Sequence, residues 1–443
     1  MKRISWLLGL TFASGSLCAA DLVQIYREAQ ANDPTFAAAR STREAGHERE
    51  PQGLSGLLPN VALSGNSTWN DNEIRFRSGA FPPAKPKYNS NGYTLSLSQP
   101  LFRWQNWVAY GQSKLQVAQA EANFVQAQQD LVLRVAQAYF DLLYANENLA
   151  AVRANKTAIE QQLESAKKNF EVGTATITDT HEAQSRFDLA VAQELAAEND
   201  LEVKRRTLQS IIGKVPEALA PLKSTVALTT PEPASMDKWV QAAERDSTSV
   251  QIQQAAADIA AKEVERQRAG HYPTVDLVAA KGRSNNFAST AFGMTETDFQ
   301  NVGVQLNLPL YQGGVVNSRT REAAANRGAA LSSLEAARRS AALAARQYYL
   351  GVVNGLAQVK ALDAALASSQ LALESNRLGY EVGVRINIDV LNAEQQVYVT
   401  RRDLAKAKYD TLLAQLRLKA AVGALGEDDV QQINGLLDPA AAK

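Results

Sequence analysis

The segment Phe170-Glu-Val-Gly-Thr-Ala-Thr-Ile-Thr-Asp179 is echoed later in the chain by Tyr380-Glu-Val-Gly-Val-Arg-Ile-Asn-Ile-Asp389. Other landmarks keep nearly the separation of 210 residues that relates Gly173 to Gly383: Pro100 with Pro309, Tyr139 with Tyr348, and Gly213 with Gly423. A fixed long-range period is the signature of a repeated architecture. The chain is therefore an internal duplication, and each half reads as helix, two strands, long helix, glycine-containing turn and helix.

The length and net charge of the chain restrict its domain organisation and its possible partners. A chain of 443 residues would ordinarily form two or three domains, but the duplication indicates one architecture built from two similar halves. We expect the repeats to span 21–235 and 236–425, with a C-terminal segment at 426–443. The 46 basic and 46 acidic residues balance, so the chain lacks the basic patch that a nucleic-acid partner requires.

The first twenty residues have the pattern of a secretory signal peptide. Lys2 and Arg3 precede an apolar run from Trp6 to Ala13, and small residues follow up to Ala20. We expect cleavage after Ala20. Lipid attachment at Cys18 is the rival interpretation, but that signal requires a small residue where this chain has a leucine. Removal of Cys18 would leave a chain without disulfides or thiolate metal sites.

Two long helical segments follow from composition. Residues 107–171 contain no proline and a single glycine, and strong helix formers dominate. Small or apolar residues recur there at steps of three and four, broken at Gln129, and 315–380 has a similar pattern. Gly173 and Gly383 lie where each helix should end. We therefore predict antiparallel helix pairs over 107–213 and 315–423, with shorter opening helices at about 21–50 and 236–270.

Between each opening helix and long helix the pattern changes to the period of two that marks a β-strand. In Gly92–Leu101, Tyr93, Leu95, Leu97 and Leu101 share one face, while Thr94, Ser96 and Ser98 share the other. Val302, Val304, Leu306, Leu308 and Leu310 repeat this apolar alternation, and weaker strands precede both segments. We predict β-hairpins at about 58–101 and 272–311, with strands of about ten residues or slightly more.

Strands of that length, apolar on one face, are typical of a transmembrane β-barrel. A soluble amphipathic sheet has the same alternation, but the chain offers little further apolar sequence to pack beneath four strands. No run of eighteen apolar residues predicts a membrane-spanning helix. Because a closed barrel needs at least about eight strands, we expect two or three copies to share one barrel.

The chain resembles the TolC-like outer-membrane efflux and secretion channels over essentially its whole mature length. The resemblance lies in the following segments: Val135-Ala-Gln-Ala-Tyr-Phe140, Phe170-Glu-Val-Gly173, Ile177-Thr-Asp179, Tyr380-Glu-Val-Gly383, Asp389-Val-Leu-Asn392 and Leu416–Gly423. It implies a homotrimer in the outer membrane. The fold class is then mainly α with transmembrane β: a shared 12-stranded barrel, four strands per chain, continued into the periplasm by a helical barrel.

The same resemblance implies a gate at the periplasmic end, where the helix hairpins turn at Gly173 and Gly383. Tyr380 and Arg385 would bind Thr178 and Asp179, with some links crossing to the neighbouring protomer. A few charge-assisted hydrogen bonds can hold such an element closed and still yield to a partner.

By the same resemblance, Asp389 would contribute to an acidic constriction ring. Asn392 stands where close relatives can carry a second Asp, so we predict weaker block by multivalent cations than a doubly acidic ring gives.

Simpler roles remain open for these residues. Asp179 and Asp389 also fit as N-caps, because Asp is favoured there, and Arg385 fits as an exposed surface charge. The histidines at positions 47, 181 and 271 lack the spacing of metal ligands. No phosphate-binding glycine loop, nucleophile elbow or zinc-ligand pair is present, so we expect no enzyme activity and no cofactor.

The sequence therefore predicts a passive exit duct of a tripartite efflux pump or type I secretion system. The expected partners are a periplasmic adaptor (membrane fusion) protein, an inner-membrane pump or ABC translocase, and outer-membrane lipid. The alternative is a periplasmic adaptor or structural coiled-coil protein, which would not need strand pairs in both halves. A general porin is opposed by the small number of strands. The cargo and the adaptor stay open.

Overall fold

The computed structural model describes residues 19–75, 77, 82–223, 226, 228–289 and 292–438. Residues 1–18 of the expected signal peptide, including Cys18, lie outside the described residues, as do 439–443 at the other end. The chain divides into two compact units: unit 1 contains 1–40, 125–248 and 338–443, and unit 2 contains 41–124 and 249–337. Each unit contains segments from both halves of the duplication.

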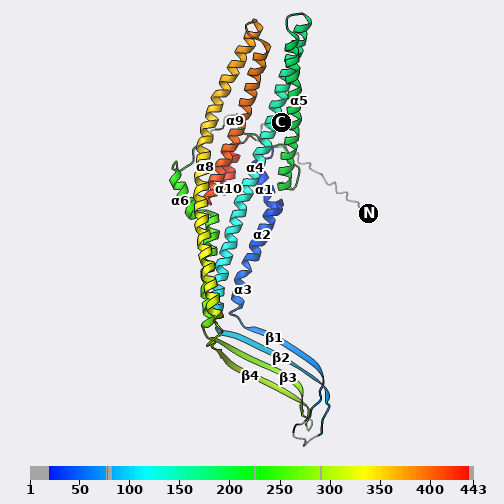
Figure 1. Cartoon of the computed structure of the whole chain (residues 1–443), viewed down its shortest axis with the longest axis vertical. Helices are drawn as coiled ribbons and strands as arrows, with labels where there is room; N and C mark the ends of the chain where they lie inside the picture. Colours follow the sequence, from blue (N-terminus) through cyan, green and yellow to red (C-terminus); the bar gives the residue numbers. More distant parts are fainter. Residues whose placement is uncertain are drawn as a thin grey trace, which may run out of the picture. The chain divides into compact units, whose positions relative to one another are not determined.

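Unit 2 contains an antiparallel sheet of four strands in the order β1-β2-β3-β4 (Figure 1). The strands are β1 (Asn60–Asp71), β2 (Lys87–Phe102), β3 (Thr274–Ser289) and β4 (Gly293–Asn307). Leu97 of β2 lies opposite Ala279 of β3, so the hairpins from the two halves join into one sheet. Strand β1 has 12 residues, as predicted, but β2, β3 and β4 have 15 or 16 and are longer than predicted. Leu308 and Leu310 lie beyond the end of β4.

The two faces of this sheet differ in polarity. Leu63 of β1 lies opposite Leu95 of β2, and Leu277 of β3 lies opposite Val304 of β4, all on one face. This apolar face is uncovered in the single chain, where Leu63 is 74% and Val304 64% exposed. The other face carries Ser, Thr, Asn and Gly at most positions. Such a sheet needs an apolar environment on one side and water on the other.

Both edges of the sheet are unpaired within the described chain, because β1 and β4 each have a single neighbour. An open strand edge presents a row of N–H and C=O groups ready to pair with another strand. Strands from another chain could pair with these two open edges. Residues 76 and 78–81 of the loop between β1 and β2 lie outside the described residues.

The predicted opening helices are each interrupted. The first comprises α1 (Leu22–Asn32), α2 (Pro34–His47) and α3 (Arg49–Ser55). Asp33 separates α1 from α2, where its carboxylate accepts a hydrogen bond from the backbone N–H of Phe36 at 2.6 Å. Proline is also favoured at the first position of a helix, so Pro34 reinforces the new start. The second comprises α6 (Met236–Asp246) and α7 (Thr248–Arg268), followed by a 3₁₀ turn at Ala269–His271.

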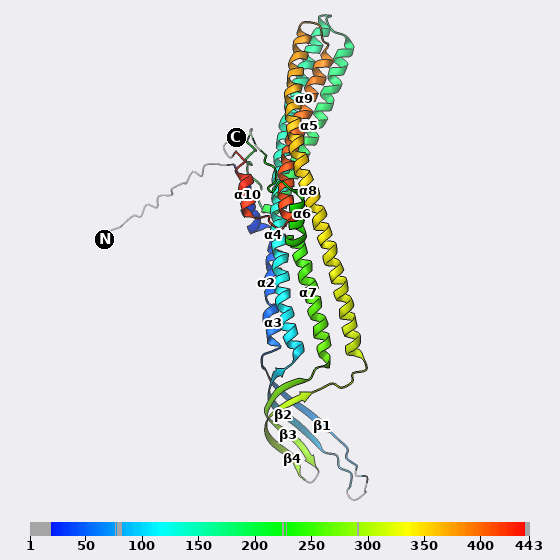
Figure 2. The ribbon, with the colours of Figure 1, turned by 90° about the vertical axis from the view of Figure 1, so that its left-hand side faces the viewer.

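Unit 1 contains two helical hairpins. The long helices are α4 (Trp104–Glu171) and α8 (Val315–Glu381), of 68 and 67 residues, and their C-terminal parts lie in unit 1. Helix α5 (Ile177–Ile212) returns along α4, and α9 (Asn387–Ala421) returns along α8. The turns of these first and second hairpins lie at the same end of the unit (Figure 2). A short α10 (Glu427–Asn434) packs near α1.

Aromatic side chains form a core in unit 1. Tyr139 is fully buried and its hydroxyl donates to the carbonyl of Ala220 at 2.8 Å. Phe140 packs against Tyr139 and against Tyr409 of α9, with ring centres 5.8 and 5.5 Å apart. Tyr348, the counterpart of Tyr139 in the second half, is only partly buried. The duplicated sequence therefore does not produce two equal cores.

The polar residue that breaks the apolar pattern of α4 is part of this packing. Gln129 is buried, and its amide donates to the carbonyl of Gly423 at 3.0 Å. The hydroxyl of Thr248 lies 3.3 Å from the amide oxygen of Gln129. A buried amide with both ends paired carries no desolvation penalty from unmet hydrogen bonds. Gln129 therefore joins α4 to the segments beside it.

Among the described residues, α8 alone is long and apolar enough by composition to cross a membrane, and its most apolar stretch is largely exposed in the single chain. Frequent alanine, rather than a run of consecutive apolar residues, makes α8 apolar by composition. Its exposed residues include Leu343 and Leu350, which are 55% and 49% exposed.

Candidate gate at the helix-hairpin tips

The turns of the two hairpins have the same backbone conformation. Gly173 and Gly383 both have φ of 79°, in the left-handed region that favours glycine. The N–H of Thr174 donates to the carbonyl of Asn169, and the N–H of Val384 donates to that of Gly379, each at 2.8 Å. We call residues 172–176 and 382–386 the first and second tips. Their side chains differ although their backbones agree.

A reciprocal hydrogen-bonded pair begins α5 at the first tip. The N–H of Asp179 donates to the hydroxyl of Thr176 at 3.3 Å, and the N–H of Thr176 donates to the carboxylate of Asp179 at 2.9 Å. This is a capping box with Thr176 as the N-cap. The simpler interpretation of Asp179 as the N-cap is therefore wrong by three residues. Thr178, the other expected latch residue on α5, is exposed.

The second tip lacks that box. Ile386 occupies the N-cap position of α9 and has no side-chain group to accept a hydrogen bond. Asp389 is again the third helical residue rather than the N-cap, but its carboxylate faces Arg385 at 3.7 Å. A Cβ atom on Gly379 would lie 2.7 Å from Cγ of Arg385. The absent side chain at Gly379 therefore provides the space that the stem of Arg385 occupies.

One hydrogen bond joins the last turns of α4 and α8. The side-chain amide of Asn169 donates to the hydroxyl oxygen of Tyr380 at 3.2 Å. Within the described part of the single chain, neither Tyr380 nor Arg385 is hydrogen-bonded to Thr178 or Asp179. The sequence did not indicate Asn169, whose counterpart in the second half is a glycine.

A second link joins the returning helices. Arg186 of α5 donates from Nη2 to the side-chain oxygen of Asn392 in α9 at 2.8 Å. Asn392, a residue expected in the constriction ring, is therefore bound to the first hairpin. Sequence reasoning missed Arg186 because its spacing from Asn392 follows no local period, and only the packing of α5 beside α9 brings them together. Leu391 packs with Ala190 in the same region.

Charged links lie within each hairpin. In the second hairpin, Arg377 of α8 binds the buried carboxylate of Glu394 in α9 at 2.8 Å. In the first, Arg153 and Lys156 of α4 bind Glu194 of α5 at 3.0 and 2.7 Å. The hydrogen bonds from Lys156 and Arg153 lower the pKa of Glu194 below its ordinary value. Each hairpin is thus held together by ion pairs.

The links between the hairpins that the structure describes include no such ion pair. Besides Asn169–Tyr380 and Arg186–Asn392, the hydroxyl of Tyr409 donates to the carboxylate of Glu147 at 2.5 Å. Burial raises the pKa of Glu147, with the bond from Tyr409 acting in the opposite direction. None of these three bonds pairs two opposite charges, and Asn169–Tyr380 joins two neutral groups, which makes it the weaker kind of hydrogen bond. The two hairpins are therefore joined there without the paired charges that link the helices within each of them.

The tips also expose aliphatic side chains. Val172 on the first tip is 72% exposed, and Val384 on the second is 78% exposed. At the positions equivalent to Thr174 and Thr176, the second tip has Val384 and Ile386. Exposed, clustered apolar residues on a surface mark sites of protein association.

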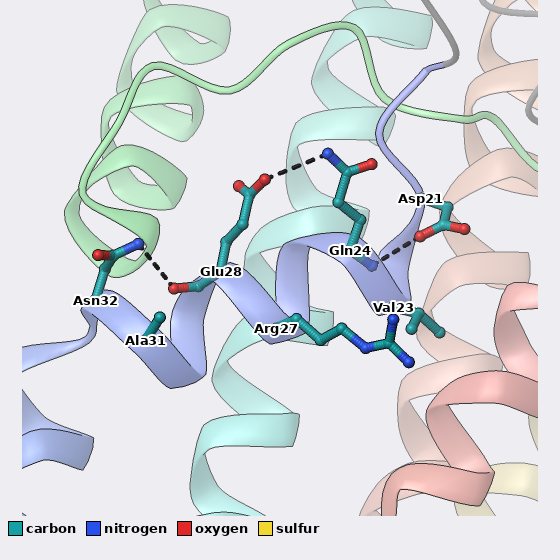
Figure 3. A pocket seen from close by; sticks show the side chains of 7 residues that line it. All are labelled: Asp21, Val23, Gln24, Arg27, Glu28, Ala31 and Asn32. Atoms are coloured by element: carbon teal, nitrogen blue, oxygen red, sulfur yellow. Dashed lines mark hydrogen bonds between the residues drawn. The ribbon is translucent and has the colours of Figure 1, made fainter. Parts of the chain in front are cut away.

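Two hollows lie elsewhere in unit 1. The first, of about 530 Å³, is an open depression along α1 (Figure 3). Asp21, Gln24 and Glu28 line it and bond to one another or to the helix backbone. The second, of about 420 Å³, is lined by 229–232, Trp239 and parts of α9 and α10. Within the described ranges, no three His, Cys, Asp or Glu side chains are grouped to hold a metal ion.

Comparison with known proteins identifies the family. The family model described as outer membrane efflux protein matches residues 25–214 and again 239–424, one match for each half of the duplication. The chain belongs to the outer membrane efflux protein family. The adaptor interpretation is therefore not favoured.

Individual relatives agree with this assignment. The chain is 33% identical to the outer membrane protein TolC of Vibrio cholerae, over 95% of this chain and 94% of that protein. It is also 33% identical to the alkaline protease secretion protein AprF of Pseudomonas aeruginosa, over 98% and 91% of the two chains. Among solved structures, the Campylobacter jejuni CmeC outer membrane channel superposes with a TM-score of 0.79 at 15% identity, covering 99% and 98%.

The protein is accordingly an outer-membrane channel for efflux or type I secretion, and it is not an enzyme. It resides in the outer membrane and has a long helical periplasmic extension. Channels of this family are trimeric and work together with efflux or secretion machinery. Three four-stranded sheets give the twelve strands of the shared barrel that the family resemblance implied, whereas the strand pattern alone had left two or three copies open.

Proposed function

We propose that this channel is a passive duct, closed at its periplasmic end by the hairpin tips and opened when a periplasmic adaptor docks there. The adaptor would connect it to an inner-membrane pump or ABC translocase, which would supply the energy. The observation that carries this proposal is the distribution of links in unit 1. Ion pairs hold each hairpin together, whereas hydrogen bonds with a neutral partner join one hairpin to the other.

This distribution favours movement of the hairpins as two bodies. If the second hairpin turns relative to the first, the Arg377–Glu394 pair travels with it, and the bonds of Tyr380 and Asn392 to the first hairpin are exchanged. Each exchanged bond contributes about 0.5 to 1.5 kcal/mol, or somewhat more where Arg186 supplies the charge. A sum of that size holds a two-state element closed without preventing a partner from opening it.

Some contacts of the proposed latch form within one chain, and others would form between protomers of the trimer. Tyr380 has a hydrogen-bond partner within its own chain, Asn169. Arg385 is exposed and lies 3.7 Å from Asp389 of its own chain, and Thr178 is exposed. We propose that Arg385 meets Thr178 or Asp179 of a neighbouring protomer, as the family resemblance implies. Asp179 retains free acceptor capacity for such a contact, because its described bonds to Thr176 use one carboxylate oxygen.

Asp389 is proposed to face the channel axis as the constriction ring. Its carboxylate is 34% exposed and lies 3.7 Å from Arg385, so it is accessible to ions while partly compensated. Three such carboxylates around an axis attract cations. With Asn392 in the next turn, the ring is singly acidic.

The proposed chain organisation follows the duplication. A signal peptide at 1–20 would direct export, repeats at 21–235 and 236–425 would each supply a strand pair and a helix hairpin, and 426–443 would form a separate segment after the second repeat. In the described part of the last segment, Leu437 pairs with Leu222 in an isolated bridge, which ties it to unit 1. Outer-membrane lipid would cover the apolar face of the sheet, and the two exposed tips would meet the adaptor.

Docking at the tips can be tested with paired variants. Val384→Asp places a charge on the second tip, while Thr207→Asp, the control, places one on an exposed polar position of α5 away from the tips. Efflux or secretion in cells and co-purification of crosslinked envelope partners should be lost for Val384→Asp with trimer level unchanged. Normal transport by a correctly assembled Val384→Asp channel would contradict docking through this tip.

A further inference from the structure

The proposal concerns the charge at the periplasmic constriction, and it rests on the proposed ring at Asp389. Arg186 of α5 places a guanidinium at Asn392, with Nη2 and the side-chain oxygen 2.8 Å apart. Asn392 lies one helical turn after Asp389, on the same side of α9, since residues three apart are neighbours on a helix surface. The turn next to the ring therefore carries a cation held from the first hairpin.

The charges around the ring can be summed from these contacts. Asp389 faces Arg385 at 3.7 Å, and Asn392 is neutral and bound to Arg186. The four side chains together carry one net positive charge per chain. In the first hairpin, Glu182 occupies the position equivalent to Asn392. The basic residues between 177 and 192 are Arg186 and His181.

We propose that Arg186 determines the charge selectivity of the constriction. Its guanidinium offsets the attraction of the Asp389 ring for cations and disfavours multivalent cations at the next turn. The duct then admits small anions and acidic cargo more readily than a ring flanked by carboxylates would. Asn392 acts as the positioning residue, because its amide oxygen holds the guanidinium beside the ring.

This assignment changes the expectation for Asn392→Asp. From the sequence alone, a second acid should increase block by multivalent cations. Because Arg186 lies within hydrogen-bonding distance, an Asp at 392 would form an ion pair with it and add little net charge. The carboxylate introduced by Asn392→Asp should bind multivalent cations and increase their block only when Arg186 is also replaced by a neutral residue.

The experiment is a set of planar-bilayer recordings of purified channels under a KCl gradient, with hexaamminecobalt(III) added to the periplasmic side. The set comprises the parent, Arg186→Gln, Arg186→Lys, Asn392→Asp and the double variant Arg186→Gln/Asn392→Asp. Arg206→Gln is the matched control, since it removes the same charge from α5 at a residue that pairs with Glu202.

Arg186→Gln should raise the cation-to-anion permeability ratio by about three-fold, the scale of one unit charge acting over several ångströms in water. Arg186→Lys and Arg206→Gln should keep the parent ratio. Asn392→Asp should change cobalt block little, and the double variant should be blocked at a concentration lower by about ten-fold or more.

The outcomes distinguish an electrostatic role of Arg186 from a tethering role, and both from a failure of the proposed channel function. If Arg186 is only a tether, Arg186→Gln raises conductance while the reversal potential stays at the parent value, and the proposal is overturned. Equal block of Asn392→Asp and the double variant also overturns it, even if Arg186→Gln assembles poorly by itself. If the parent forms no channels at all, the proposed duct fails together with this inference.

Discussion

The side-chain amide of Asn169 and the hydroxyl of Tyr380 lie 3.2 Å apart and join the last turns of α4 and α8. Both residues sit at the end of a long helix, directly before a glycine turn. A bond at this position is made once per chain and opposes separation of the two hairpins where the duct is proposed to close.

Tyr380→Phe should therefore favour the open state. The change removes the hydroxyl and about 0.5 to 1.5 kcal/mol of hydrogen bonding per chain, with little change in packing. Larger single-channel conductance, or more frequent openings, should result in planar bilayers. Tyr348→Phe, on the same helix but away from the tip, is the control and should behave as the parent does. A Tyr380→Phe channel with parental conductance would show that the bond does not hold the gate.

The difference in capping between the two tips predicts one stabilising and one destabilising substitution. Ile386 occupies the position of Thr176, and Asp389 that of Asp179. Ile386→Thr should complete a second capping box and stabilise the first turn of α9 by about 1 kcal/mol. Hydrogen exchange of the first amides of α9 should slow.

Thr176→Ala provides the converse test at the first tip. Loss of the cap should speed exchange at the start of α5 to a similar extent. If neither variant alters exchange, the capping geometry does not control the stability of the tips. The Ile386→Thr variant should also draw Asp389 away from Arg385 and so make the proposed ring more acidic.

Replacement of glycine by alanine should change the stability in opposite directions at two sites, Gly383 in the turn and Gly328 inside α8. Gly383 has φ of 79° and open space where a Cβ would lie, so Gly383→Ala should cost about 1 kcal/mol through backbone strain alone. Gly328 lies inside α8 with equally open space, and Gly328→Ala should stabilise by up to about 1 kcal/mol. Thermal unfolding followed by circular dichroism would measure both; shifts of the same sign would contradict the explanation.

Asp33 predicts a pH dependence of stability. Its buried carboxylate is bound by both terminal nitrogens of Arg134, at 2.9 and 3.1 Å. Burial acts to raise the pKa of Asp33, but the hydrogen bonds from Arg134 and from the N–H of Phe36 outweigh it and lower the pKa below 3.8. A lowered pKa contributes stability that is present above the unfolded-state pKa and is lost as the pH falls through the folded-state value.

Asp33→Asn should reduce stability at neutral pH by about 3 kcal/mol, because Arg134 and the start of α2 lose an ionised partner. The difference from the parent should shrink as the pH falls below about 4. Asp410→Asn, at an exposed pair with Lys406, is the control and should cost about 0.5 kcal/mol or less. A difference that stays constant down to about pH 3 would contradict the assigned pKa direction.

The sequence predicted the order and kind of the elements because their signals are local. The period of two at 92–101 and the absence of proline through 107–171 are properties of consecutive residues, and both correspond to observed elements. The duplication added the pairing of the halves. The opening helices were predicted as continuous because helix-forming composition on both sides outweighed the short cap at Asp33 and Pro34.

The contacts at the gate were less accessible to sequence reasoning. Asn169–Tyr380 and Arg186–Asn392 join residues more than 200 positions apart, and no local pattern marks their partners. The expected links of Tyr380 and Arg385 to Thr178 and Asp179 are not made within the described part of one chain, and links that cross between protomers stay a prediction. Asp179 was placed at a helix start, but Thr176, three residues earlier, has the capping hydroxyl.

The central claim is that three copies of this chain complete one conducting barrel. Protein extracted from outer membranes should be measured by light scattering in detergent and then reconstituted in planar bilayers. The account predicts a particle of three chains and discrete single-channel currents that increase in Tyr380→Phe. A monodisperse single chain that stays soluble without detergent and carries no current would contradict it.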